Sequence, residues 1–110
     1  MSEYNLYLNG ILRAIHRIEN SVKNKDFEKF KQDDIIDATS MRLQIIGESI
    51  RKLDAGLKRK YKLNWEKYLQ TRNIISHAYF AVNPKILWSI IKKDIPKLKK
   101  VIKKIIQKEK

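Results

Sequence analysis

The sequence contains no cysteine and little glycine or proline, with three Gly and two Pro in 110 residues. Without thiols there can be no disulfides, cysteine nucleophiles or cysteine-based metal sites, which fits a reducing compartment. The scarcity of Gly and Pro disfavours a β fold with many tight turns. We therefore expect a helical, cytoplasmic protein.

Long apolar runs are also missing. No segment approaches the roughly 18 apolar residues of a membrane span, and the start MSEYNLYLNGIL lacks the basic and apolar regions of a secretory leader. The chain has two histidines, His16 and His77, and no pair of carboxylates clusters near His77. We therefore expect no membrane insertion, no metal site and no bound cofactor.

Positive charge is abundant. Lys and Arg number 25 against 12 Asp and Glu, which gives a formal net charge of +13. Such a surplus on a small domain attracts polyanions through phosphate neutralisation and counterion release, so RNA is the first partner to consider. Because 19 of the 25 basic residues are Lys, genome composition or a solvated surface is an alternative explanation.

Apolar residues recur with helical spacing in four stretches. The expected helices cover residues 4–22, residues from about 35 to 57, residues 65–77, and a last stretch from 84 onward that Pro96 bends or divides. These elements predict an all-α fold, an up-and-down bundle of four to five helices in a single domain of residues 1–110.

Helix starts and one glycine refine this expectation. Residues able to cap or open a helix precede the last three stretches: Asp33 and Asp34, Asn64, and Asn83 with Pro84. Gly47 lies inside the second helix, where glycine costs about 1 kcal/mol relative to alanine. We therefore expect a neighbouring helix to approach closely at Gly47.

The segment TRNIISHAYF, residues 71–80, carries polar groups within an otherwise apolar stretch. On an ideal helix Arg72 and His77 point about 140° apart, whereas Ser76 and Tyr79 lie on the same side as Arg72. To bring His77 to Arg72, the helix must end or distort near Ser76, or a second copy must complete the site.

This pair could cleave RNA. A histidine with a pKa near ~6.5 can take the proton of a 2′-hydroxyl, and Arg72 can stabilise the charge that develops on phosphorus. Asn73 could orient either the phosphate or the histidine, and no metal would be needed. Plainer roles also remain open, because His77 could be a partly buried, hydrogen-bonded histidine and Tyr79 a core aromatic.

The C-terminal stretch, residues 92–110, holds nine Lys against Asp94 and Glu109, a net charge of +7. Such a basic amphipathic helix binds nucleic acid or a membrane surface in some proteins and is merely solvated in many others. The candidate RNA-binding residues in it are Lys99, Lys100, Lys103 and Lys104.

Three segments together carry a family resemblance: IIGE at residues 45–48, the pattern R-N-x3-H-x-Y at residues 72–79, and ILWSIIKKDIPKL at residues 86–98. With these segments, and with Trp65 opening the third helix, the chain resembles the HEPN superfamily over most of its length. Within that superfamily it is similar to the HepT-like toxins that are paired with minimal nucleotidyltransferase antitoxins.

The resemblance implies a homodimeric, metal-independent endoribonuclease, the toxin of a type VII-like toxin–antitoxin pair, with an Arg-x4-His active site at the dimer interface. Arg72 and His77 match the catalytic pair, and Asn73 matches its polar neighbour. Tyr79 matches the tyrosine to which the antitoxin transfers AMP from ATP, and added phosphates beside an anion-binding cleft repel RNA. Arg42 is a candidate for the basic residue that supports the cleft in relatives.

The chain also departs from the family pattern. Thr71 stands where relatives usually carry a larger apolar residue, and the connection before Trp65 is rich in lysine rather than proline. Some members of the superfamily bind nucleotides or RNA without cutting them. The alternative interpretation is therefore a non-catalytic basic helical module that binds RNA, a nucleotide or a nucleotidyltransferase partner.

Overall fold

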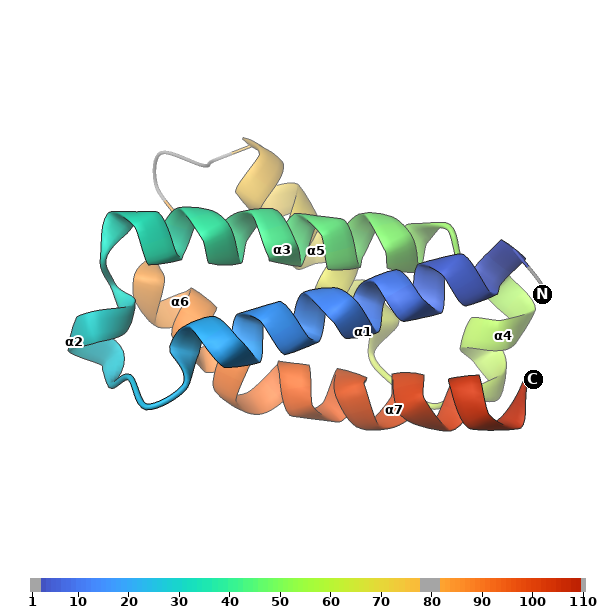
Figure 1. The fold of residues 1–110 in the computed structure, drawn as a ribbon. Helices are drawn as coiled ribbons and strands as arrows, with labels where there is room; N and C mark the ends of the chain where they lie inside the picture. Colours follow the sequence, from blue (N-terminus) through green and yellow to red (C-terminus); the bar gives the residue numbers. More distant parts are fainter. Residues whose placement is uncertain (1–2, 78–81, 110) are drawn as a thin grey trace.

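The computed structural model describes residues 3–77 and 82–109, and within these ranges it is a helical bundle without strands (Figure 1). The long elements are α1 (Glu3–Val22), α3 (Asp33–Arg51), α5 (Trp65–His77), and a continuous run of α6 (Pro84–Ser89), η2 (Ile90–Asp94) and α7 (Ile95–Lys108). Two short helices, α2 (Phe27–Phe30) and α4 (Ala55–Lys60), lie in the connections. The prediction of an all-α bundle is confirmed.

Two pairings organise the bundle around α1. Helix α3 returns antiparallel along one side of α1, and α7 runs along its other side (Figure 1). Helix α5 packs on α3 and ends near the middle of it (Figure 1). The α5 and α7 segments, which carry most of the candidate functional residues, therefore rest on different neighbours.

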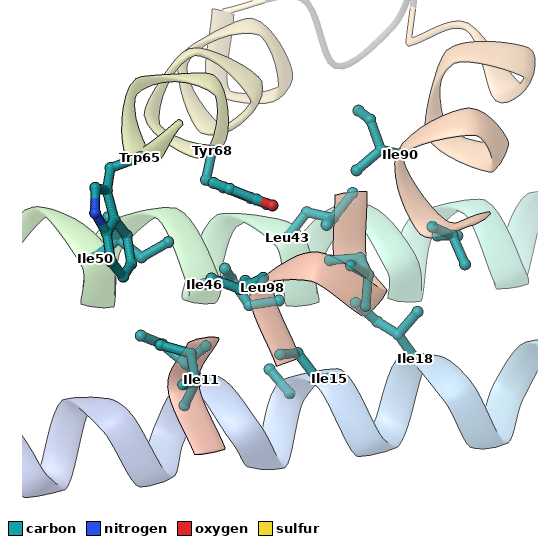
Figure 2. Close-up of a cluster of buried hydrophobic side chains, with 14 of the residues drawn as sticks. Ile11, Ile15, Ile18, Leu43, Ile46, Ile50, Trp65, Tyr68, Ile90 and Leu98 are labelled. Carbon is teal, nitrogen blue, oxygen red and sulfur yellow. The ribbon is translucent and has the colours of Figure 1, made fainter. Parts of the chain in front are cut away.

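Apolar stripes from every long helix meet in one core. Ile11, Ile15 and Ile18 of α1 face Leu43, Ile46 and Ile50 of α3, and Leu98 of α7 fills the space between the two rows (Figure 2). All seven side chains are at most 2% exposed. Burial of these stripes is what selects the helix faces, because removing apolar surface from water is the main favourable term in folding.

The N-terminal end of α5 is held in place by polar contacts as well as by packing. The indole nitrogen of buried Trp65 donates to the carbonyl oxygen of Lys58 over 2.9 Å. The hydroxyl of Tyr68 donates to the carbonyl oxygen of Asp94 over 2.7 Å, and Lys67 Nζ lies 3.0 Å from Asp94 Oδ1. Burial, together with the charge of Asp94, raises the pKa of Tyr68, so its proton stays in this contact.

Two of the expected helix starts are confirmed and one is corrected. Asn64 Oδ1 accepts from the backbone nitrogen of Lys67 over 3.3 Å, and Asn83 Oδ1 accepts from that of Lys85 over 2.9 Å. The α3 helix instead begins at Asp33 itself, with Gln32 at the N-cap, so both residues of the acidic pair lie within the first turn. There the acidic pair still stabilises the positive end of the helix dipole.

The expected second helix is too long, because α3 ends at Arg51 rather than near residue 57. Asp54 starts a new short helix, α4, by accepting from the backbone nitrogen of Leu57 over 3.1 Å. Asp26 does the same for α2, accepting from the backbone nitrogen of Lys29 over 3.0 Å. Both short helices were missed, since their apolar residues are too few to show a helical period.

Pro96 bends the last helix without dividing it. Proline has no N–H, and its ring crowds the carbonyl four residues earlier, so regular α-helical bonding fails at this point. The chain widens into the π turn η2, where the nitrogen of Ile95 bonds to the carbonyl oxygen of Ile90, five residues back. Helix α7 then continues, with buried Ile95 and Leu98 turned to the core.

The close approach expected at Gly47 is present, and its partner is Arg72. A Cβ placed on Gly47 would overlap the Cβ of Arg72 and lie 3.1 Å from the carbonyl oxygen of Tyr68. Gly10 of α1 shows the opposite case, because no heavy atom other than those of the local helix backbone lies within 4 Å of the place that a methyl group would take there. Glycine at 47 therefore permits the α3–α5 contact at the site of Arg72.

We predict that Gly47→Ala lowers the free energy of unfolding by about 1–2 kcal/mol, because the overlap with Arg72 outweighs the better helix propensity of alanine. Gly10→Ala is the matched control and should raise it by up to about 1 kcal/mol, since nothing obstructs the methyl group. Urea unfolding of both variants measures this difference. Equal stabilisation by the two substitutions would contradict the close α3–α5 approach.

Candidate active site

The side chain of Arg72 lies where α5 crosses α3, and it is 35% exposed. Its Nη2 is 3.3 Å from Glu48 Oε2, and its Nη1 donates to Asn73 Oδ1 over 3.1 Å. These contacts fix the plane of the guanidinium at the rim of the helix pair. A guanidinium carries five N–H donors, so it retains capacity to bind an anion.

Glu48 is the acidic partner of Arg72. Its other oxygen, Oε1, accepts a hydrogen bond from Arg51 Nη2. This hydrogen bond is the main cause that lowers the pKa of Glu48, and the positive charges of Arg51 and Arg72 lower it further. Oε2 is buried and receives no hydrogen bond, although Arg72 stands at ion-pair distance. Glu48 is therefore ionised at neutral pH and holds Arg72 by charge rather than by a well-aligned bond.

Polar and small residues of α3 form the surface that meets α5. Gln44, Gly47, Glu48 and Arg51 follow the spacing i, i+3, i+4, i+7, which places them on one side of the helix. Gln44 Oε1 accepts from Ser76 Oγ over 3.1 Å. Sequence reasoning gave Glu48 no role, yet this polar stripe beside a mid-helix glycine was a signal that could have revealed it.

His77 is the last residue of α5 and is exposed. The helix stays regular from Trp65 to His77, so it shows no distortion at Ser76 that would turn His77 toward Arg72. The two side chains therefore leave the helix in directions about 140° apart. One copy of the chain does not gather them, and the exposure of His77 also removes the interpretation of it as a partly buried residue.

The other predicted site residues are placed as follows. Asn73 is exposed and its side chain accepts a hydrogen bond from Arg72, while Tyr79 lies outside the described residues. Arg42 donates to the carbonyl oxygen of Arg17 over 3.2 Å, so it lies on the flank of α3 that faces α1. The structure thus brings Asn73 to Arg72 and does not bring Arg42 there.

The four candidate lysines lie on α7, away from the Arg72 contact. Lys99 Nζ is 3.0 Å from Glu19 on α1, so its charge is already matched. Lys100, Lys103 and Lys104 are exposed. The basic face therefore belongs to the α7 side of the bundle, while Arg72 belongs to the α3–α5 side.

Three further observations concern the described residues around the site and beyond it. No three His, Asp or Glu side chains among residues 3–77 and 82–109 are grouped to hold a metal ion. A hollow of about 380 Å³ lies between α5 and α6, but neither Arg72 nor His77 lines it. No helix in the part of the chain that the structure describes is long and apolar enough to cross a membrane.

Comparison with known sequences defines the class to which this bundle and motif belong. The family model of HepT-like ribonucleases matches residues 11–105, which include the whole Arg72–His77 segment. The chain belongs to the HepT-like ribonuclease family. No solved structure matches the chain significantly.

Several curated proteins are similar to the chain. A Methanocaldococcus jannaschii protein named as a gamma-glutamylcyclotransferase and candidate RNase is 41% identical over 93% of this chain, which spans 47% of that relative's length. A candidate RNase of Caldanaerobacter subterraneus subsp. tengcongensis is 38% identical over a region that covers 94% of this chain and 95% of that relative's length. A candidate ribonuclease HepT of Thermococcus cleftensis is 35% identical over a region that covers 90% of this chain and 92% of that relative's length.

We predict that the pKa of Glu48 lies below its ordinary value of 4.5. Arg51→Ala should raise this pKa, because the hydrogen bond from Arg51 is the main cause of the lowering. A lowered folded-state pKa contributes stability that is present above the unfolded value and lost as pH falls through the folded one. Carboxyl-carbon NMR titration measures the shift, with Arg59→Ala on α4 as the matched control. An unchanged titration of Glu48 in Arg51→Ala would contradict the assignment.

Proposed function

We propose that the protein is a metal-independent endoribonuclease whose active site combines Arg72 of one copy with His77 of a second copy. The observation that carries this proposal is the geometry of α5 in a chain of the HepT-like ribonuclease family. A straight helix presents an arginine and an exposed histidine that one copy cannot direct at the same phosphate. In a dimer, His77 of the second copy can approach the phosphate that Arg72 of the first copy binds.

In the proposed reaction, His77 takes the proton of a ribose 2′-hydroxyl, and the oxygen attacks the adjacent phosphorus. Arg72 donates to the phosphate oxygens on which negative charge develops, and the 5′-oxygen of the next nucleotide leaves with a proton from water. The products are a 2′,3′-cyclic phosphate and a free 5′-hydroxyl. Asn73, bonded to Arg72, holds the guanidinium plane toward the phosphate.

Exposed apolar side chains near Arg72 support a homodimer. Met41 and Ile45 of α3 are 64% and 46% exposed, and they continue the line of Glu48 along that helix. Ile74 of α5 is 60% exposed and lies one turn before His77. A two-fold axis through this surface would bury these apolar groups and place Arg72 of each copy toward His77 of the other.

We predict that Arg72→Ala and His77→Ala each lower the rate of RNA cleavage by about 10²–10⁴-fold, the usual contribution of a general base or a charge-stabilising donor. Both side chains are partly or fully exposed, so the melting temperatures should change little. His16→Ala and Arg59→Ala are matched controls, since both residues are exposed and lie outside the site. Cleavage is measured on labelled RNA with chelator present, and the cyclic phosphate end is identified by mass.

Three outcomes would count against the proposal. Normal cleavage by either variant would remove that residue from the mechanism. Cleavage that requires an added divalent ion would contradict the metal-free reaction. RNA binding without cutting, unaffected by Arg72→Ala, would favour the non-catalytic basic module instead.

We further propose that the protein acts in the cytoplasm as the toxin of a toxin–antitoxin pair, silenced by a minimal nucleotidyltransferase that transfers AMP from ATP to Tyr79. Tyr79 follows His77 by two positions in the sequence, so a group attached to it would lie close to the proposed base. Each AMP adds a phosphate charge beside an anion-binding site. Repulsion and obstruction of RNA would both follow.

We predict that a nucleotidyltransferase encoded beside this chain, supplied with ATP, adds AMP to the wild-type protein and stops RNA cleavage. Tyr79→Phe should accept no AMP and should stay active in the presence of the enzyme and ATP, because the acceptor oxygen is gone. Tyr7→Phe on α1 is the matched control and should be modified normally. Intact-protein mass spectrometry measures the addition, and modification of Tyr79→Phe would contradict the assignment.

A further inference from the structure

A groove with basic walls lies between the C-terminal end of α4 and helix α7, and neither Arg72 nor His77 lines it. Lys60 and Lys62 form one wall, and Lys104 and Lys108 of α7 form the other. Its volume is about 710 Å³. Four lysines thus face one open space, although they come from segments more than 40 positions apart in the sequence.

Glu109 places a carboxylate between these walls. Its Oε2 accepts from Lys60 Nζ and from the hydroxyl of Tyr61, each over 2.8 Å. The hydrogen bond from Lys60 is the main cause that lowers the pKa of Glu109, followed by the bond from Tyr61. The groove therefore already holds one anionic oxygen with two donors, which is the arrangement that a phosphate oxygen would need.

The lysines of α7 lie on different flanks of the helix, and two of them face this groove. Lys104 and Lys108 share one flank with Val101, because they follow the spacing i, i+3, i+7. Lys99 lies on the other flank, where Glu19 of α1 neutralises it. The groove has four lysines against one carboxylate, so most of its positive charge is not balanced by groove residues.

We propose that this groove binds the phosphate backbone of single-stranded RNA as a second contact, separate from the Arg72–His77 site, and that Glu109 competes with the RNA for it. The inference rests on the RNA substrate of the proposed function. Lysines give affinity for phosphates without base preference, so the groove holds the strand and leaves the choice of cut to the other site. Displacement of Glu109 then accompanies binding.

The test uses a 2′-O-methyl RNA oligonucleotide, which has no 2′-hydroxyl and cannot be cut, so binding is measured independently of catalysis. The groove variant is Lys104→Gln with Lys108→Gln. The matched control is Lys29→Gln with Lys93→Gln, two exposed lysines outside the groove that give the same change in net charge. A third variant, Glu109→Gln, removes the competing carboxylate. Fluorescence anisotropy gives the Kd of each protein at several salt concentrations.

We expect the groove variant to weaken binding roughly tenfold and to reduce the salt slope of log K by about 1.4, because two phosphate contacts are lost at about 0.7 each. The control should change both quantities much less, and Glu109→Gln should tighten binding. Equal effects of the groove and control variants would overturn the proposal, as would weaker binding by Glu109→Gln. Failure of the proposed nuclease is seen separately, as wild-type protein that binds the oligonucleotide and cuts no RNA.

Discussion

The contact between Gly47 of α3 and Arg72 of α5 is the constraint on which the rest of the site depends. The missing side chain at Gly47 lets the two helices approach until the Cβ of Arg72 occupies the place of a methyl group. This approach fixes the rotation of α5 about its axis and puts the guanidinium beside Glu48. Every other residue of α5 then has its direction set by helical geometry.

That rotation has an immediate consequence for His77. With Arg72 turned to α3, regular helix places His77 on the outside of the bundle. The inward face of the same helix carries buried Tyr68 and Ile75 instead. The proposed dimer follows from this separation, and the exposed Met41, Ile45 and Ile74 supply an apolar surface for it.

Much of the fold was predictable because its cause is local. The apolar period of α1, the caps Asn64 and Asn83, and the need for a close neighbour at Gly47 all follow from residues within one or two turns. The short helices α2 and α4 were not predictable from periodicity, since each is too short to show one. For the site, the sequence predicted that Arg72 and His77 point about 140° apart on a regular helix. It did not predict whether the helix bends near Ser76, and the structure shows that it stays regular to His77.

Contacts between distant segments account for what sequence reasoning missed. The role of Glu48 depends on α5 lying against α3, and the pairing of Lys99 with Glu19 depends on α7 lying against α1. The lysines of α7 therefore lie on two flanks of the helix: Lys99 pairs with Glu19 of α1, whereas Lys104 and Lys108 line the groove that contains Glu109. Charge counts along the chain do not contain this division, because they do not say which lysines face a carboxylate.

The most direct test of the shared site is mixing of two inactive proteins. When Arg72→Ala and His77→Ala proteins exchange subunits, half of the dimers are mixed, and each has one site with both residues intact if the pair comes from different copies. The account predicts recovery of about a quarter of wild-type RNA cleavage after exchange. No recovery, with mixed dimers demonstrated by native mass spectrometry, would contradict it.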